Sequence, residues 1–362
     1  MNDLDFRKFP TTRYQGSKRK LLPWLYSNIK KLKFNSVIDI FGGTASVSIL
    51  FKKMGKITTF NDYLKFNYYA GKALIENRGI TLDDADINFL LKRHDTIIYN
   101  SYVQNTFSGI YYTDEENAWI DVFLCNWRNL DNIYSPKVAL YKKAIAFTAF
   151  SQSALRKRPF NLFHRANLYM RLNEVQRTFG NKTSWEGTFD TYFKYFIKEI
   201  NASIFDNKKN NKALNMRASD LIDNERYDLI YIDPPYIRKE AYGADVNYLK
   251  FYHFLEGACD FENWKDRIDY NTKNYCIKDE FNNEWIYPNK NKIAFDNLFR
   301  RFRKSKFVIS YKEPGIPSKK ELVDLIRKYK KKVISVRALK YDYALNKNNG
   351  YHKEYLLIGL DK

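Results

Sequence analysis

The sequence predicts an α/β fold in which one mainly parallel sheet is interrupted by an inserted, mainly helical domain. Short apolar segments typical of buried strands alternate with helical segments before residue 78 and again after residue 211. Between these positions the alternation disappears and helical periodicity dominates. We therefore expect a discontinuous sheet domain, residues 1–77 and 212–362, and an inserted domain, residues 78–211.

The chain carries a large excess of positive charge. Its 62 Lys and Arg residues against 41 Asp and Glu residues give a formal net charge of +21. This excess indicates a polyanionic partner such as nucleic acid, although a lysine-biased proteome could supply part of it. Hydrophobic residues make up 44% of the chain, which excludes a disordered protein.

Targeting and metal-binding patterns are lacking. The longest apolar runs, such as 144–150, are far shorter than the roughly 20 residues of a membrane span, and residues 1–5 do not resemble a signal peptide, so we expect a cytoplasmic protein. The cysteines and histidines are scattered, so neither a disulfide framework nor a metal site is predicted: Cys125, Cys259, Cys276, His94, His164, His253 and His352.

The first segment, residues 11–33, joins the motif Arg13-Tyr14-Gln15-Gly16-Ser17-Lys18 to an amphipathic helix. Lys18 stands at the helix start, where a cation is poorly placed for the helix dipole. It therefore has either an anionic partner, such as a carboxylate, or a solvated position in a basic cluster with Arg19 and Lys20.

A strand, a glycine turn and a helix start follow at residues 36–47. The turn Phe41-Gly42-Gly43-Thr44 lets backbone N–H groups approach a ligand at a helix N-terminus, and Asp39 ends the strand. The turn is neither GxGxxG nor a P-loop. A second strand, 56–60, leads to Asp62, about 20 residues after the turn, where a Rossmann-like fold binds a ribose diol.

The inserted block contains an apolar helix at 138–150 and a helix with an aromatic stripe near 189–200. Between them, residues 155–171 mix basic, amide and aromatic side chains. This mixture suits either nucleic acid contacts or an irregular loop that packs its aromatic rings. The candidate DNA-binding residues are Arg156, Lys157, Arg158, Asn161, His164, Arg165, Asn167 and Arg171.

The sheet resumes with a short strand at 212–215 that leads to Asp220. The next strand, 229–232, runs into Asp233-Pro234-Pro235-Tyr236, where two prolines stop strand pairing. An acid and an aromatic ring thus emerge where open α/β sheets bind ligands. They suit a flat, amino-bearing base, whereas the plainer interpretation is a proline-terminated strand with a surface tyrosine.

The remaining segments complete the α/β pattern. Helices are expected at 248–255 and 293–302, and a strand at 306–311. Ser318 and Glu321 form a capping box that opens another helix, and strands at 333–337 and 354–360 follow it.

Three motifs, in order, resemble those of the Dam-type (alpha-group) adenine-specific DNA methyltransferases. They are Arg13-Tyr14-Gln15-Gly16-Ser17-Lys18, the loop Asp39-Ile40-Phe41-Gly42-Gly43-Thr44-Ala45, and Asp233-Pro234-Pro235-Tyr236. Ala45 departs from the pattern, because many members have a second glycine there. The resemblance implies a Rossmann-like methyltransferase sheet, S-adenosylmethionine as cofactor and a target-recognition role for 78–211.

The resemblance also implies roles for individual residues. Asp233, Pro234, Pro235 and Tyr236 would hold a flipped adenine. The cofactor would lie against Phe41, Gly42, Gly43 and Thr44, near Tyr14, with Lys18 at its carboxylate, Asp39 at its ammonium, Asp62 at its ribose and Asp220 at its adenine amine. The partners would be duplex DNA and, in a restriction-modification system, a cognate endonuclease, unless the enzyme is an orphan methylase. We expect a monomer.

Three other functions stay open at this stage. Methylation of the cytosine 4-amino group uses the same chemistry, but that group of enzymes usually has Ser in place of Asp233. The others are an RNA adenine methyltransferase and a catalytically silent DNA-binding regulator on this scaffold. No Pro-Cys dipeptide occurs, which argues against methylation of a cytosine carbon.

Overall fold

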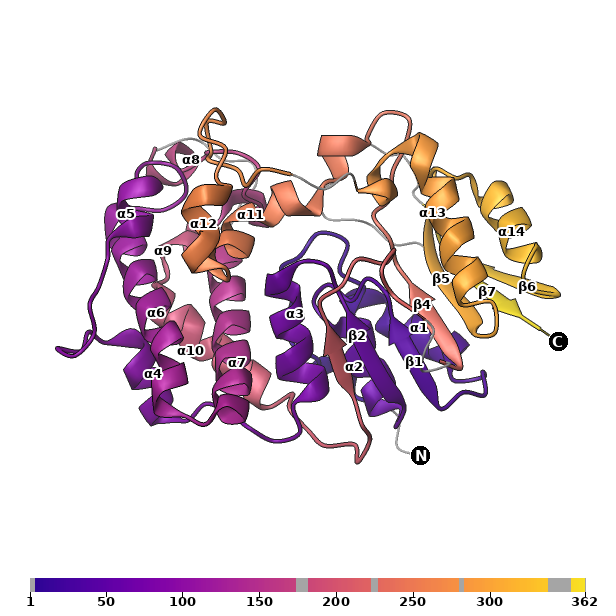
Figure 1. Ribbon diagram of the computed structural model, residues 1–362, viewed down its shortest axis with the longest axis horizontal. Helices are drawn as coiled ribbons and strands as arrows, with labels where there is room; N and C mark the ends of the chain where they lie inside the picture. The colour runs from indigo at the N-terminus through magenta and orange to yellow at the C-terminus, as the bar shows by residue number, and fades with distance from the viewer. Residues whose placement is uncertain (1–3, 174–181, 223–226, 280–282, 338–352, 362) are drawn as a thin grey trace.

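The computed structural model describes residues 4–173, 182–222, 227–279, 283–337 and 353–361 (Figure 1). Its seven-stranded sheet has the order β3-β2-β1-β4-β5-β7-β6. The strands are β1 (Ser36–Asp39), β2 (Ile57–Asn61), β3 (Lys212–Leu214), β4 (Leu229–Ile232), β5 (Lys306–Glu313), β6 (Lys332–Arg337) and β7 (Lys353–Leu360).

The helices precede, follow and interrupt these strands. They are α1 (Leu22–Ile29), α2 (Ser46–Lys53), α3 (Lys65–Gly71), α4 (Asp84–Leu91), α5 (Tyr102–Thr106), α6 (Asp114–Ile133), α7 (Pro136–Arg156), α8 (Tyr169–Leu172), α9 (Lys182–Glu186), α10 (Phe189–Asn201), α11 (Tyr248–Ala258), α12 (Phe261–Arg267), α13 (Pro288–Arg301) and α14 (Lys319–Arg327). Short 3-10 or π turns are η1 (Phe6–Lys8), η2 (Arg19–Leu21), η3 (Lys72–Glu76), η4 (Pro159–Asn161), η5 (Gly243–Val246) and η6 (Glu284–Ile286).

The strand directions confirm the predicted fold class. β3, β2, β1, β4 and β5 are parallel, and β7 is antiparallel to both β5 and β6. From β1 the chain proceeds outward to β2 on one side, whereas β4 leads outward to β5 on the other. The boundary between β1 and β4 is therefore the switch point of the sheet, where a crevice opens beyond the carboxyl ends of the strands.

Alternate strand residues pack into two different cores, as the period of an extended chain requires. Leu229 and Tyr231 of β4 face the core that contains α1 and α2, whereas Ile230 and Ile232 face the core formed with α13 and α14. Both faces of the strand are covered, which explains why its sequence is apolar without interruption.

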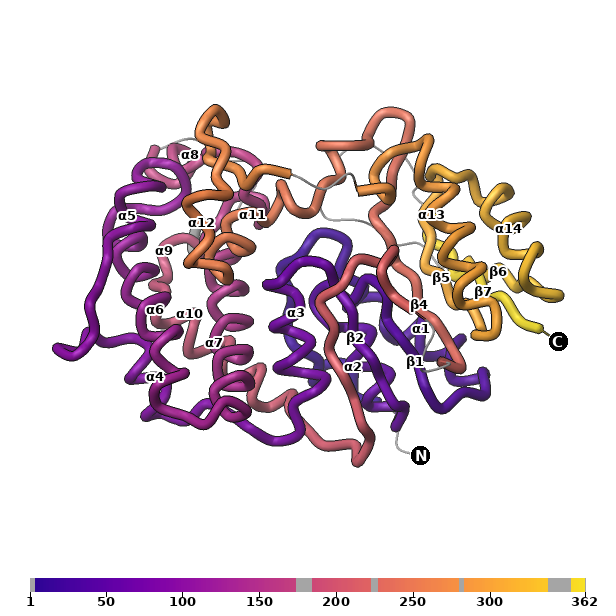
Figure 2. The backbone as a smooth tube through the Cα atoms, viewed as in Figure 1, coloured from indigo at the N-terminus to yellow at the C-terminus, as the bar shows by residue number. Residues whose placement is uncertain are grey.

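The inserted helices gather on one side of the sheet, on the left in Figure 1. α11 and α12 lie with them, although they follow β4 in the sequence, and the chain then returns to α13 (Figure 2). Tyr111 joins the two groups, because its hydroxyl lies 2.7 Å from the Nε2 atom of His253 and donates to the Asn274 carbonyl at 2.9 Å. The helical part thus includes residues from both sides of β4.

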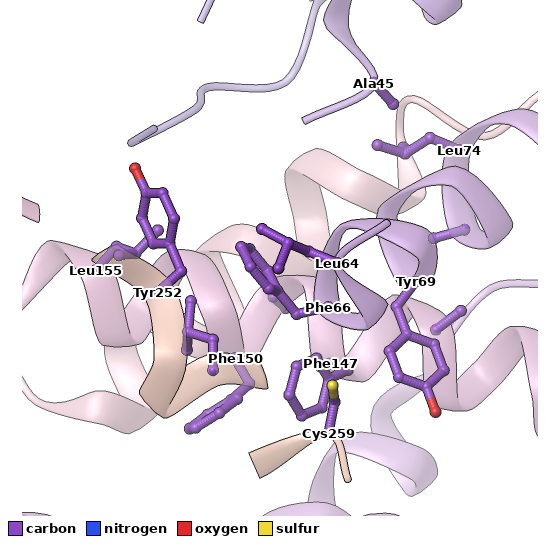
Figure 3. Close-up of a cluster of buried hydrophobic side chains, with 14 of the residues drawn as sticks. Ala45, Leu64, Phe66, Tyr69, Leu74, Phe147, Phe150, Leu155, Tyr252 and Cys259 are labelled. Carbon is purple, nitrogen blue, oxygen red and sulfur yellow. The ribbon is translucent and has the colours of Figure 1, made fainter. Parts of the chain in front are cut away.

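α3 connects the sheet to the helical part. Figure 3 shows its Phe66 and Tyr69 beside Phe147 and Phe150 of α7. The Tyr69 and Phe147 rings are 5.4 Å apart, and the Phe66 ring is 5.5 Å from that of Tyr252 in α11. One continuous apolar core therefore extends from the sheet into the helices.

The predicted elements occur in the predicted order. The capping box is confirmed, since Ser318 accepts from the Glu321 N–H and Glu321 accepts from the Ser318 N–H. α13 begins five residues earlier than expected, with Pro288 in its first turn, a position where proline is well tolerated. No helix in the described ranges is both long and apolar enough to cross a membrane.

Candidate functional site

A single cavity lies beyond the carboxyl ends of β1, β2 and β4. Its lining brings together nearly all the residues predicted from sequence to bind cofactor or act in catalysis: Tyr14, Lys18, Asp39, Phe41, Gly42, Gly43, Thr44, Asp62, Asp233, Pro234, Pro235 and Tyr236. Asp220 is the exception. The parallel arrangement of the strands explains the convergence, because their carboxyl ends meet at one edge of the sheet.

The glycine turn after β1 forms one wall of the cavity. A side chain at Gly42 would meet the Phe60 ring at 2.2 Å, so only glycine fits there. Gly43 and Ala45 both have left-handed backbone, with φ of 51° and 62°. The left-handed conformation at Ala45, which precedes α2, gives a physical reason for glycine at this position in many similar proteins.

Asp39 is a buried carboxylate with an unused acceptor. Its Oδ2 atom accepts a hydrogen bond from the Ser48 hydroxyl at 2.6 Å, whereas Oδ1 has no hydrogen-bond partner among the described residues. Burial raises the pKa of Asp39 to about 7, against the opposing effect of the Ser48 bond. A buried acceptor beside a cavity suits a ligand cation or N–H group.

Asp62 shapes the glycine turn. Its two oxygens accept the backbone N–H groups of Gly43 and Leu64, both at 2.9 Å. Burial raises the pKa of Asp62 to about 6, and the two backbone bonds lower it. Because a carboxylate has about four acceptor sites, Asp62 can also accept from a ligand hydroxyl.

The turn at residues 233–236 is held by an ion pair. The Lys18 ammonium is 2.8 Å from Asp233 Oδ1 and also 3.4 Å from Glu354. The Tyr236 hydroxyl donates to the same Asp233 Oδ1 atom at 2.6 Å. This structure favours the first of the two interpretations of Lys18, a cation with carboxylate partners.

Both of these contacts, from Lys18 and from Tyr236, involve Oδ1 of Asp233. The Asp233 side chain is 15% exposed and lines the cavity. Burial raises the pKa of Asp233, while Lys18 opposes that rise. The arrangement therefore anchors one carboxylate oxygen of a side chain that lines the cavity.

Two contributors to the site were not predicted from sequence. Tyr248 lines the cavity, and its ring is 5.5 Å from that of Tyr14, which stacks on Tyr252. Glu354 lies on the predicted last strand, and its carboxylate reaches Lys18 and Tyr236. A lone acid at the start of an otherwise apolar strand is the signal that could have identified Glu354.

Asp220 lies outside the main cavity. Its side chain is exposed, and its carboxylate accepts a hydrogen bond from the neighbouring Ser219 hydroxyl at 2.8 Å. A second cavity adjoins the first through Phe41, Tyr63 and Pro235, and the backbone just before Asp220 borders it. The lining of this second cavity comprises Ile40, Phe41, Tyr63, Met216, Arg217, Ala218, Pro235, Asn283, Glu284 and Trp285.

Half of the predicted DNA-binding residues point inward. Arg158 is buried and donates to the carbonyls of Tyr111 and Arg165 and to the Asn167 side chain. Arg171 forms a two-bond pair with Glu116, which also binds Lys157 at 2.8 Å. DNA cannot reach Lys157, Arg158, Asn167 or Arg171 in this conformation, because protein groups already occupy these side chains.

The other half remain at the surface. Arg165 is exposed, whereas Arg156, Asn161 and His164 are partly exposed. Asn161 Oδ1 accepts a hydrogen bond from the Arg13 side chain at 3.4 Å. Arg13 precedes Tyr14, which lines the cavity. Asn161 is therefore linked to the N-terminal motif.

Comparison with known proteins finds a matching family model and relatives that are named as methyltransferases or modification methylases. The model of the family "D12 class N6 adenine-specific DNA methyltransferase" matches residues 14–325. The chain is 24% identical over 358 residues to the Type II methyltransferase M2.HphI of Haemophilus parahaemolyticus, covering 97% of this chain and 98% of that protein.

Two further relatives are about twice as long. The chain is 25% identical to the modification methylase StsI of Streptococcus sanguinis, covering 94% of this chain and 50% of the relative. It is also 25% identical to the modification methylase LlaI of Lactococcus lactis subsp. lactis, covering 88% of this chain and 49% of the relative. The chain thus spans about half the length of these two proteins.

The pKa of Asp39 predicts how this residue affects stability. A carboxyl group whose pKa is raised by folding stabilises the protein below its unfolded pKa, and this contribution is lost as the pH rises through about 7. Asp39→Asn removes the buried charge, so it should stabilise the ligand-free protein at pH 8, by roughly 2–4 kcal/mol, and by progressively less toward pH 4. Thermal or denaturant unfolding at several pH values measures this difference.

Asp220→Asn is the matched control, because Asp220 is exposed, and should leave the stability unchanged at each pH. A stability difference for Asp39→Asn that is independent of pH would contradict the raised pKa of the buried Asp39.

Proposed function

We propose, because this chain belongs to the D12 class N6 adenine-specific DNA methyltransferases, that it moves a methyl group from S-adenosylmethionine to the 6-amino group of an adenine flipped out of duplex DNA. The proposed mechanism rests on different roles for the two carboxylate oxygens of Asp233. Lys18 and Tyr236 contact Oδ1 of Asp233, the side chain lines the cavity, and Oδ2 would be the oxygen that accepts from the substrate. The order of the three sequence motifs further supports the alpha group of these enzymes.

Asp233 would act on the amine by accepting its hydrogen bond. The lone pair of the adenine 6-amino nitrogen is delocalised into the ring, which makes the amine a poor nucleophile. Acceptance of one N–H by Asp233 Oδ2 and of the other by the Pro234 carbonyl would draw the nitrogen toward a tetrahedral shape and localise its lone pair. Asp233 would remain an acceptor, and no covalent enzyme intermediate is needed.

Tyr236 would fix the position of the base. Its hydroxyl is bonded to Asp233, so the ring is held beside the carboxylate that binds the amine. Stacking of the flipped base on this ring would set the distance from the amine to the transferred methyl group, and such positioning supplies much of the rate enhancement. Tyr248 lines the same cavity and would limit the other movements of the base.

The residues present fit S-adenosylmethionine, which supplies a methyl group on a sulfonium. The unpartnered Oδ1 atom of Asp39 would accept from the methionine ammonium. The backbone of residues 41–44 and Tyr14 would lie against the methionine portion, and Asp62 would bind the ribose. The adjoining second cavity would hold the cofactor adenine, with Asp220 at its rim as the partner of the adenine amine.

The role expected for Lys18 changes in this proposal. Sequence reasoning placed its ammonium near the carboxylate of the cofactor, whereas in the structure two protein carboxylates surround it. We assign Lys18 to holding Asp233 in place and keeping it ionised, since a nearby cation favours the charged form of a carboxyl group.

The helical part would bind the DNA target. We propose that residues 78–211 recognise the site, that α11 and α12 support them, and that Arg156, Asn161, His164 and Arg165 contact the backbone or bases. Several relatives are called modification methylases, which supports a restriction-modification system with a cognate endonuclease. The enzyme would act on DNA in the cytoplasm, as a monomer.

The chemistry can be tested by transfer of labelled methyl groups from S-adenosylmethionine to duplex DNA and, in parallel, to RNA. The wild-type chain should label duplex DNA, and digestion should yield N6-methyladenine. Asp233→Asn should reduce the rate by roughly 10²–10³-fold, since an amide oxygen is a weaker acceptor than a carboxylate.

Asp324→Asn is the control of the same chemical type, because Asp324 is exposed and lies outside both cavity linings, and it should retain catalysis. Substantial transfer by a folded Asp233→Asn variant, or transfer to RNA alone, would contradict the mechanism.

The proposed DNA-binding surface predicts that substitutions of two exposed basic residues differ in their effect on DNA binding. Arg165→Ala should weaken DNA binding about threefold to tenfold at low salt and lower the salt dependence of binding by about one ion. Lys332→Ala, at the start of β6 on the side of the molecule remote from α8 (Figure 1), should do neither. Fluorescence anisotropy across a salt series measures both quantities, and equal effects of the two variants would exclude a dedicated surface at Arg165.

A further inference from the structure

We infer that Glu354 is a positioning residue of the methyl-transfer site, which accepts the Tyr236 hydroxyl hydrogen when Asp233 engages the adenine amine. This inference rests on the proposed function. Glu354 lies on β7, beyond the last residue matched by the family model, residue 325. Its role therefore comes from the contacts of the chain itself.

The burial of Glu354 requires an explanation. Its side chain is 2% exposed and lies on the same face of β7 as Leu356 and Ile358, which are core residues. A carboxylate in such surroundings is costly unless a cation or hydrogen-bond donors offset its desolvation. Lys18 at 3.4 Å and the Tyr236 hydroxyl at 3.2 Å supply these partners.

The Tyr236 hydroxyl has one hydrogen and two carboxylates within reach. The contact with Asp233 Oδ1, at 2.6 Å, is shorter than the one with Glu354, at 3.2 Å. If the hydrogen turns to Glu354, Asp233 loses a donor and becomes a stronger acceptor for the adenine amine. The phenol remains bonded throughout, so its ring keeps its place.

Glu354 also balances the charge of Lys18. The ammonium is surrounded by Asp233, Glu354 and the Gly16 carbonyl at 3.3 Å, and it lies 4.8 Å from the centre of the Tyr236 ring. The negative charge of Glu354 partly offsets the electrostatic effect of Lys18 on the Asp233 carboxylate. Accordingly, Glu354 raises the pKa of Asp233, in addition to the larger effect of burial.

Lys312 is a further charged group near Glu354, as its partner across the β5 and β7 pair. Burial lowers the pKa of Lys312 to about 8, and Glu354 opposes that change. Lys312 therefore belongs to the charges that set the electrostatic field around Glu354, together with Lys18, Asp233 and Tyr236.

Glu354→Gln tests this inference, because it keeps the size and one acceptor oxygen but removes the charge. We expect kcat to fall roughly tenfold, with KM for DNA and for S-adenosylmethionine changed less than about threefold. The acidic limb of the kcat profile should move to lower pH, since repulsion no longer raises the pKa of Asp233. A merely structural residue would not move this limb.

Glu313→Gln is the control, since Glu313 lies on the same strand pair opposite Lys353 and outside the cavity lining. It should leave kcat and the pH profile unchanged. Glu354→Asp is a second test variant, in which the charge withdraws by one methylene, so the acidic limb should move in the same direction by less.

Failure of the role assigned to Glu354 can be distinguished from failure of the proposed function. An unshifted acidic limb in folded Glu354→Gln, or in Glu354→Asp if the Gln variant does not fold, would overturn the role of Glu354 while the wild-type enzyme still methylates DNA. If the wild-type chain transfers no methyl group to adenine, the proposed function fails as well, and with it the role of Glu354.

Discussion

The ion pair between Lys18 and Asp233 is the interaction on which the site depends. It joins the N-terminal motif to the end of β4 and lies over the switch point of the sheet. Without the cation, the pKa of this buried carboxyl group would rise further, which disfavours the ionised form that accepts from an amine. The pair engages Oδ1 of Asp233, a residue that lines the cavity, and in the proposed mechanism Oδ2 accepts from the adenine amine.

The fold places several carboxylates together in a position where burial makes their ionised form energetically unfavourable. Asp39, Asp62, Asp233 and Glu354 are all buried or nearly so at one edge of the sheet, and burial raises the pKa of the first three. Backbone N–H groups offset this cost for Asp62, and Lys18 does so for Asp233 and Glu354. Asp39 keeps an unpartnered oxygen, as expected for a group that a ligand completes.

The strands and the acids at their ends could be predicted from sequence, because a buried parallel strand has a local apolar signature and its carboxyl end lies beside those of its neighbours. That reasoning located Asp39, Asp62 and Asp233 in one cavity. It did not place Glu354 beside Lys18, because that contact depends on the antiparallel insertion of β7 between β5 and β6. Nor could it show that Arg158 is buried, since clustered cations look alike in sequence whether they face DNA or backbone carbonyls.

The most direct test of the account is to express the wild-type chain and Asp233→Asn in a host without DNA methylation and to map modified bases by single-molecule sequencing. The account predicts N6-methyladenine at one recurrent sequence motif with the wild-type chain and none with the variant. A genome without any modified motif, or one carrying N4-methylcytosine instead, would contradict it.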